Sequence, residues 1–184
     1  VTSTNDVAIN LIKNKNKNFG CVYSDLQTRG RGTHGNKWVS EKGNLFVSLF
    51  FPIKEKYPSF SEFAIINPVI ILDVIKKFCD SKKLSIKYPN DIFCNRKKIC
   101  GLLQELVTLN NRKFLIIGIG INIISNPNIK NVYKATNIYS ETSKKASILK
   151  IINLILSSYS SFLSNLDIYN YEEFKKRADL LSIK

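Results

Sequence analysis

Residues that build metal sites and redox centres are scarce in this sequence. Its 184 residues include no methionine, one histidine, one tryptophan and four cysteines. With His34 as the single histidine and no Cys-x-x-Cys pair, neither a credible zinc site nor a Ser/His/Asp triad can be assembled. All four cysteines lie in apolar segments, where a free cysteine behaves as a small hydrophobic side chain. A reducing, cytoplasmic compartment is the simplest expectation.

Long hydrophobic runs are missing as well. None approaches the roughly 20 apolar residues that span a bilayer, and residues 1–20 lack the apolar core of a signal peptide. We therefore expect no membrane segment. A hydrophobic fraction of 44% and a charged fraction of 23% are typical of globular domains. The prediction is one domain over residues 1–184, although a chain that begins with Val1 in an expected strand also fits a fragment of a longer protein.

Acidic residues are few relative to basic ones. The chain has 14 Asp and Glu against 28 Lys and Arg, which gives a net charge of +14 and a pI of about 9.7. One interpretation is an anionic partner such as nucleic acid, a membrane surface, an acidic protein or a nucleotide. The other is compositional bias of the kind an AT-rich genome produces. The lysines are scattered along the chain, which favours bias for most of the charge.

Apolar spacing and turn residues predict strands and helices in mixed order. Strands are expected at the end of Val1–Ser3 and at residues 21–27, 44–51, 84–87, 92–94, 98–108 and 113–123, with hairpin turns at 95–97 and 110–111. Helices are expected at residues 5–13, 59–81, 145–164 and 171–181, and Pro68 should kink or divide the second. Residues 124–142 are expected to be irregular. The mixture predicts an α+β fold: a mixed, mostly antiparallel sheet with helices packed on it.

Two stretches carry the residue types that bind anions. Residues 30–35 read Gly-Arg-Gly-Thr-His-Gly, and glycines let backbone N–H groups approach anionic oxygens while Arg31 can fork onto a phosphate or carboxylate. A surface loop with turn glycines would look the same. A second stretch runs from Lys87 to Asp91 and returns through a basic turn to Lys98. If that hairpin is tight, Asp91 and Lys98 lie on adjacent strands, and the lysine can meet negative charge on a phosphate.

Two more stretches have both a functional and a structural interpretation. The expected strand at residues 118–122 (Gly-Ile-Gly-Ile-Asn) has two glycines, which indicate close approach of another group or a β-bulge. Ser3, Thr4 and Asn5 at the strand-to-helix corner could bind a polar ring or simply cap the helix. Trp38 follows the glycine loop and could stack on a base. None of these motifs is specific when taken alone.

Taken in order, five stretches resemble the catalytic domain of biotin protein ligases. They are Thr2-Ser-Thr-Asn5, the run from Gln27 to Trp38, Gly43 to Ser48, Lys87 to Asp91 with Lys98 to Gly101, and Gly118 to Asn122. The resemblance is firm over about residues 1–124 and loose beyond them. It implies a biotin/lipoate ligase-like, class II synthetase-like fold. It also implies that the small C-terminal β-barrel of many members is absent or truncated, and that no N-terminal DNA-binding domain is present.

The resemblance implies a two-step reaction. The carboxylate of biotin attacks the α-phosphate of ATP, giving biotinyl-5′-AMP and pyrophosphate, and a lysine of a carrier domain then takes the biotinyl group and releases AMP. The implied cofactors are ATP and Mg²⁺, with the metal carried by ATP rather than by a cage of protein ligands and Asn90 as a candidate contact. The implied partner is the biotin carboxyl carrier domain of a carboxylase. No DNA or membrane partner is expected, and both a monomer and a homodimer remain open.

The family pattern also implies residue roles. Biotin would be bound by Ser3, Thr4, Asn5, Gln27, Gly30, Arg31, Gly32, Thr33, Lys98 and Gly101. Among these, the first four would hold its bicyclic head, the glycine loop would wrap its carboxylate, and a side chain at Gly101 would block its pocket. ATP or the adenylate would be bound by Arg31, Trp38, Asn90, Lys98 and Asn122, with Asn122 at the adenine edge and Trp38 closing over it. Lys98, Arg31 and Asp91 would be catalytic, with Asp91 orienting Lys98 or the incoming lysine.

The sequence also departs from the family pattern. The glycine loop commonly reads Gly-Arg-Gly-Arg-Arg-Gly-Arg, but Thr33, His34 and Asn36 stand here at three of its positions. Fewer cations would weaken retention of the adenylate or slow its formation. Tyr88 replaces a usual tryptophan. Three alternatives therefore stay open: a lipoate or octanoate ligase of the related fold, a basic nucleic-acid-binding module, and an inactive paralogue.

Overall fold

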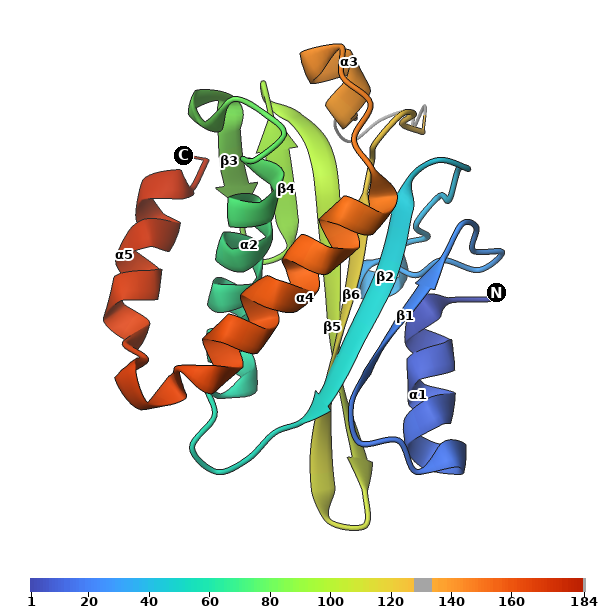
Figure 1. Ribbon diagram of the computed structural model, residues 1–184, viewed down its shortest axis with the longest axis vertical. Coiled ribbons are helices and arrows are strands. Elements are labelled where there is room, and N and C mark those ends of the chain that lie inside the picture. Colours follow the sequence, from blue (N-terminus) through green and yellow to red (C-terminus); the bar gives the residue numbers. More distant parts are fainter. Residues whose placement is uncertain (128–133, 184) are drawn as a thin grey trace.

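A six-stranded sheet forms the centre of the computed structural model, which describes residues 1–127 and 134–183 (Figure 1). Its strands are β1 (Gly20–Ser24), β2 (Leu45–Pro52), β3 (Leu84–Lys87), β4 (Asp91–Cys94), β5 (Lys97–Leu109) and β6 (Arg112–Ile121). They lie in the order β1-β2-β6-β5-β4-β3, and every neighbouring pair is antiparallel. The predicted mostly antiparallel sheet is confirmed.

Five α-helices surround this sheet within the described residues. They are α1 (Thr4–Lys15), α2 (Phe60–Ile75), α3 (Ile138–Thr142), α4 (Ile148–Ser164) and α5 (Tyr171–Leu181). Short 3₁₀ turns lie at Thr33–Gly35, Ser81–Lys83 and Leu166–Ile168. None of the helices in residues 1–127 and 134–183 is long and apolar enough to cross a membrane.

The sheet separates two apolar cores, because successive side chains of a strand point to opposite faces. Leu49, Leu115 and Ile117 belong to the larger core, which α2 and α4 complete and against which α5 packs. Phe50 and Ile116, one residue away in the same strands, belong to the smaller core beneath α1. Helix α1 therefore covers the face of the sheet opposite α2 and α4 (Figure 1).

The face beneath α1 changes from apolar to polar along the sheet. Phe50 and Ile116 are cross-strand partners and pack under the helix. Two residues further along the same face, Ser48 pairs with Gly118 near the first turn of α1. Beyond them, Gly120 of β6 lies opposite Gly101 of β5. On β6, glycines thus replace large side chains just past the N-terminus of α1, and this leaves a hollow on the sheet.

Most predicted elements are confirmed, and the strand 84–87 and the helix 171–181 match to the residue. Both hairpins are also present. The predicted strand at Val1–Ser3 is wrong. These residues lie beside residues 26–29, where Thr28 and Arg29 donate their N–H groups to the carbonyls of residues 1 and 2, but no ladder extends from this contact. The strand expected at 21–27 ends at Ser24, because its hydroxyl bonds the backbone of Leu26 and turns the chain.

Two further predictions were wrong in the second half of the chain. The helix expected over 59–81 ends at Ile75, and Pro68 lies inside it without dividing it. Proline removes one backbone hydrogen-bond donor from the helix. Buried residues precede and follow Pro68 in α2, so their packing outweighs the loss of that hydrogen bond. Residues 124–142 are not wholly irregular, because α3 forms at 138–142 with Asn137 as its N-cap. Residues 128–133 of that stretch lie outside the described residues.

Candidate active site

The hollow on the α1 face is a pocket. Its walls come from the N-terminus of α1, the glycine loop, the β4–β5 hairpin, β6, and the segments on either side of residues 128–133. Of the site residues predicted from the sequence, all except Gly30 line it. Gly30 is buried behind the wall, where an added Cβ would lie 2.5 Å from the Trp38 carbonyl oxygen. The structure therefore brings the predicted residues together, while their ligand-binding roles stay predictions.

One corner of the pocket is built by the first turn of α1. Thr4 donates its backbone N–H and its hydroxyl to Gln27 Oε1, at 2.8 and 3.2 Å. The Ser48 hydroxyl lies 2.7 Å from Thr4 Oγ1 and 2.5 Å from Asn5 Oδ1. Ser3 occupies the N-cap position, but its side chain makes no capping bond. These polar groups are thus fixed by one another and by the sheet rather than by helix capping alone.

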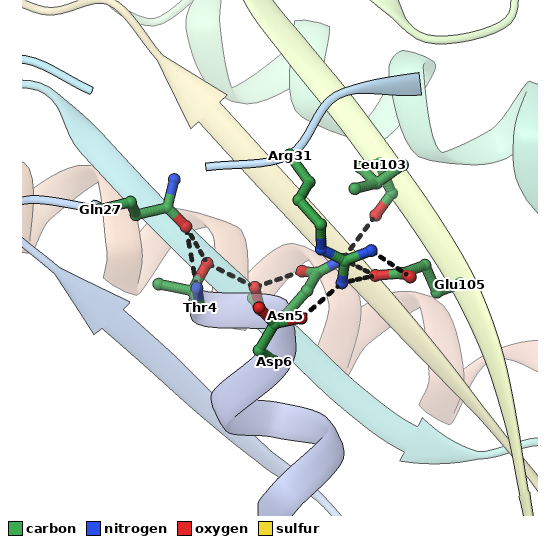
Figure 2. A network of polar contacts seen from close by, with 8 residues as sticks. Thr4, Asn5, Asp6, Gln27, Arg31, Leu103 and Glu105 are labelled. Atoms are coloured by element: carbon green, nitrogen blue, oxygen red, sulfur yellow. Dashed lines mark hydrogen bonds and ion pairs between the residues drawn. The ribbon is translucent and has the colours of Figure 1, made fainter. Parts of the chain in front are cut away.

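A charged network continues from this corner (Figure 2). Asn5 donates its side-chain N–H groups to Glu105 Oε2 at 2.6 Å and to the Leu103 carbonyl at 3.3 Å. Arg31 descends from the glycine loop and forks onto both oxygens of Glu105, at 2.8 and 2.7 Å. It also donates to Asp6 Oδ1 at 2.8 Å. The loop is therefore tied to β5 and to α1 through one guanidinium group.

The Arg31 contacts bear on its predicted catalytic role. The hydrogen bonds from Arg31 to Glu105, helped by the charges of Glu105 and Asp6, raise the pKa of the guanidinium despite its partial burial. Three of its five N–H donors are used by carboxylates of the chain. Arg31 lines the pocket, but in this arrangement it anchors the glycine loop, and contact with a ligand carboxylate or phosphate stays a prediction.

Two backbone hydrogen bonds hold the two sides of the glycine loop together. The Trp38 N–H donates to the Gly30 carbonyl at 2.9 Å, and the Gly32 N–H donates to Asn36 at 2.7 Å. Between these bonds the chain turns with His34 and Gly35 in the left-handed region, at φ 55° and 75°. The turn places Thr33, His34 and Asn36, which stand at the positions where the family pattern has arginine, on the pocket wall.

Trp38 lies across two glycines on the floor of the pocket. Gly101 and Gly120 are cross-strand partners, and a Cβ on either would come within 2.4 to 2.5 Å of the indole ring. The Lys98 ammonium lies 5.2 Å from the ring centroid, within range of a cation–π contact. The buried indole N–H has no hydrogen-bond partner in residues 1–127 and 134–183. A side chain at Gly101 was expected to block the biotin pocket, and in the structure it would meet the Trp38 ring.

Lys98 and Asp91 meet across the β4–β5 hairpin as predicted. Lys98 Nζ lies 2.7 Å from Asp91 Oδ1, and the two side chains are 11% and 13% exposed. A register shift between Ile92 and Phe93 brings Lys98 opposite Phe93. Two opposite charges held this close in a nearly buried site fix each other's orientation. The pair lines the same pocket as the polar corner at α1, and Lys98 lies beside the Trp38 ring, so the pocket contains a fixed cation.

Asn90 and Asn122 complete the far side of the pocket. Asn90 donates its amide nitrogen to Thr33 Oγ1 and Asp91 Oδ1, both at 3.3 Å. No hydrogen bond among the described residues uses its amide oxygen, and oxygen is the atom that a hard cation prefers. Asn122 donates its amide nitrogen to the Thr136 carbonyl at 3.0 Å, so it supports the chain beside the pocket, and its contact with a base stays a prediction. No group of three or more His, Cys, Asp or Glu suited to a metal ion occurs in the part of the chain that the structure describes.

Two residues of the site were missed in the sequence. Ser48 holds Thr4 and Asn5 together, and Glu105 holds Asn5 and Arg31. Ser48 interrupts the otherwise apolar strand β2. Glu105 follows Gly101 at even spacing and so lies on the same face of β5. The available signal for Glu105 was a charged residue on the same strand face as Gly101.

Tyr88 precedes the turn that places Asn90 and Asp91, and its buried hydroxyl has no hydrogen-bond partner among the described residues. Burial raises the pKa of this phenol, with a further contribution from Asp179. An unpaired buried hydroxyl costs about 1–3 kcal/mol. We therefore expect Tyr88→Phe to raise the free energy of unfolding by about 1 kcal/mol in urea denaturation.

Tyr159→Phe is the matched control for this prediction. Its hydroxyl is buried but donates to Asn67 Oδ1 at 2.9 Å. The same deletion should therefore lower the free energy of unfolding by about 1 kcal/mol, because the Asn67 oxygen loses its partner. Equal effects of the two substitutions would contradict the prediction for Tyr88.

Comparison with known proteins agrees with this geometry. The chain matches the biotin/lipoate A/B protein ligase family over residues 1–122, and it belongs to that family. An Arabidopsis thaliana protein named biotin–protein ligase 2 is 27% identical over 98% of this chain and 55% of its own length. The chain spans about half the length of the curated relatives it matches.

Solved structures of biotin protein ligases share the fold. The Leishmania major enzyme, solved in complex with biotinyl-5-AMP, is 27% identical and has a TM-score of 0.84 over 99% of this chain and 78% of its own. The Aquifex aeolicus enzyme, solved with biotin and ATP, is 26% identical and has a TM-score of 0.80 over 98% of this chain and 75% of its own. The resemblance drawn from the sequence to a biotin protein ligase catalytic domain is confirmed.

Proposed function

We propose that this chain is an ATP-dependent biotin ligase. It joins biotin to AMP and then transfers the biotinyl group to a lysine of a biotin carrier domain. The observation that carries the proposal is the nearly buried Lys98–Asp91 pair, which lines one pocket together with a polar corner and an aromatic floor. Structures of similar enzymes in complex with biotinyl-5-AMP and with biotin and ATP support it.

In the first step a carboxylate oxygen of biotin attacks the α-phosphorus of ATP. A new P–O bond forms, the bond to the pyrophosphate oxygen breaks, and pyrophosphate leaves. Negative charge grows on the phosphoryl oxygens, and the fixed ammonium of Lys98 stabilises it without reorganisation. Mg²⁺ bound to ATP would neutralise phosphate charge, and the unused amide oxygen of Asn90 is the side-chain atom suited to contact it.

In the second step the ε-amine of the carrier lysine attacks the acyl carbon of the mixed anhydride. An amide bond forms, the bond from the acyl carbon to the AMP oxygen breaks, and the amine gives up a proton. The Asp91 carboxylate, 2.7 Å from the Lys98 ammonium, orients Lys98 or the incoming amine. No covalent enzyme intermediate is needed, so the positions of the bound groups and the fixed charges supply the catalysis.

The shape and polarity of the pocket favour biotin over a linear acyl chain. Ser3, Thr4, Asn5 and Gln27 offer several donors and acceptors at one corner, and they are held rigid by Ser48 and Glu105. A ureido ring can use such an array, whereas a linear chain such as octanoate has no polar atoms to place there. The proposed partner is the biotin carboxyl carrier domain of a carboxylase.

Biotin-dependent exchange of pyrophosphate into ATP tests the adenylating step directly. We expect exchange with biotin and at least about tenfold less with lipoate at equal concentration. Purified carrier domain should then become labelled at its target lysine, and a carrier with that lysine changed to arginine should not. Exchange with lipoate alone would move the chain to the other branch of its family. No exchange with either acid would contradict the proposal.

A further inference from the structure

A short segment that begins at Lys134 lies against the backbone of Lys98. We call residues 134–137 the strap. The Lys98 N–H donates to the Lys134 carbonyl at 2.9 Å, and the Thr136 N–H donates to the Lys98 carbonyl at 2.8 Å. The strap is itself held by Asn122, whose side chain donates to the Thr136 carbonyl at 3.0 Å. Both backbone groups of the proposed catalytic lysine are therefore paired with the strap.

Glu141, in the short helix α3, connects the strap with the hairpin that carries Lys98. Its Oε1 accepts hydrogen bonds from the Thr136 hydroxyl at 2.6 Å and from the Lys97 ammonium at 2.9 Å. Its Oε2 accepts from Asn95 in the turn of the hairpin. Asn95 lies in the turn and Lys97 begins β5 directly before Lys98, while Thr136 is the strap residue bonded to the Lys98 carbonyl.

The carboxylate of Glu141 is held in its charged form by these contacts. Its side chain is only 6% exposed. Burial by itself would raise the pKa of Glu141, but the hydrogen bonds from Thr136, Lys97 and Asn95 outweigh it, and the pKa is lowered. A buried carboxylate that accepts from three side chains is a rigid junction, because each lost bond would leave charge unpaired.

We propose that Glu141 is a positioning residue for Lys98. It does not line the pocket, so it acts through Lys97 and Thr136, which fix the Lys98 backbone from two directions. The role rests on the proposed function, in which Lys98 meets the α-phosphate. With the junction intact, the Lys98 ammonium stays in contact with Asp91 and faces the pocket.

Glu141→Gln is the sharpest test, because it keeps the shape of the side chain. All three partners of the carboxylate act as donors, so the amide nitrogen of glutamine would meet a donor and the charge opposite Lys97 would be lost. Glu173→Gln on the exposed surface of α5 is the matched control. Thr136→Val removes one bond of the junction and keeps the backbone bonds of the strap.

The first readout is hydrogen exchange of single amides, measured by NMR. In Glu141→Gln the amides of Lys98 and Thr136 should exchange at least about tenfold faster than in the parent. The Ile117 amide in the middle of β6 should keep its rate, because β6 is paired on both sides there. Thr136→Val should give a smaller increase, and the control should give none.

The second readout separates binding from chemistry. The biotin corner is built by the first turn of α1, Gln27 and Ser48, and is held by Glu105, which lies further along β5 from Lys97. None of these residues bonds Glu141 in the described part of the chain. In Glu141→Gln the Kd for biotin should therefore stay within about twofold while the kcat of pyrophosphate exchange falls about tenfold or more. A general loss of structure would instead change both in proportion, together with the thermal midpoint.

Three results would overturn the proposal. They are unchanged amide rates at Lys98 and Thr136, unchanged kcat, and a loss of biotin affinity equal to the loss of kcat. Failure of the proposed function is a distinct result, because the parent would then show no biotin-dependent exchange. In that case the amide rates alone decide whether Glu141 holds Lys98.

Discussion

Lys98→Ala should reduce biotin-dependent pyrophosphate exchange by about 10²- to 10³-fold, the range found when a single preorganised charge-stabilising group is removed. The reason is geometric: the ammonium is fixed 2.7 Å from Asp91 and 5.2 Å from the Trp38 ring centroid, so it needs no reorganisation to meet growing negative charge. The measurement is the initial rate of exchange at saturating biotin and ATP. Lys176→Ala, an exposed lysine of α5, is the control and should keep the parent rate.

Loss of stability must be separated from loss of chemistry in this variant. Removing Lys98 leaves Asp91, which is 13% exposed, without its ion-pair partner, and such a change destabilises by a few kcal/mol (about 3–5 for a fully buried pair). The double substitution Lys98→Ala with Asp91→Asn removes the stranded charge. It should recover most of the free energy of unfolding and none of the exchange activity. Recovery of activity in the double variant would contradict the role given to Lys98.

The predicted fold succeeded where the sequence pattern is local. The strand 84–87 and its hairpin partners were found because apolar runs alternate with turn residues such as Asn95 and Arg96, which both adopt positive φ. The end of the second helix was missed because nothing local stops it at Ile75. Helix α3 has five residues, which is too few for a helical period to appear in the sequence.

The predicted site residues cluster in one pocket, while their roles stay predictions. Lys98 and Asp91 could be placed together because a hairpin has a fixed register, whereas Arg31 and Glu105 are 74 residues apart and meet only through the fold. From the sequence, Arg31 could be interpreted only as a residue that binds an anionic ligand. Its carboxylate partners, Asp6 in α1 and Glu105 in β5, are distant in the sequence and could not be paired with it. Glu141 could not be identified from the sequence, because two of its partners, Asn95 and Lys97, come from the distant β4–β5 hairpin and meet it only in the fold.

Gly118→Ala is expected to weaken biotin binding by at least about tenfold, since misplacement of a contact by about 1 Å can cost a hundredfold. An added Cβ at this position would lie 2.4 Å from Asn5 Oδ1 and 3.0 Å from its Cγ. Asn5 cannot simply swing aside, because its amide nitrogen bonds Glu105 and Leu103 and its oxygen contacts the Ser48 hydroxyl at 2.5 Å. Calorimetric titration with biotin in the absence of ATP measures the effect.

Gly120→Ala provides the matched comparison, because it adds the same methyl group to the same strand and the same face. Its Cβ would lie 2.5 Å from Trp38 Cε2 and Cζ2 and would reach no atom of Asn5 among its nearest contacts. It should therefore raise the KM for ATP in pyrophosphate exchange, with a smaller change in the Kd for biotin than Gly118→Ala produces. If both alanines changed the biotin Kd equally, separate positions for biotin and the nucleotide in this pocket would be contradicted. A selective loss for Gly118→Ala would place the biotin head at the corner formed by α1 and β6, and the nucleotide over Trp38.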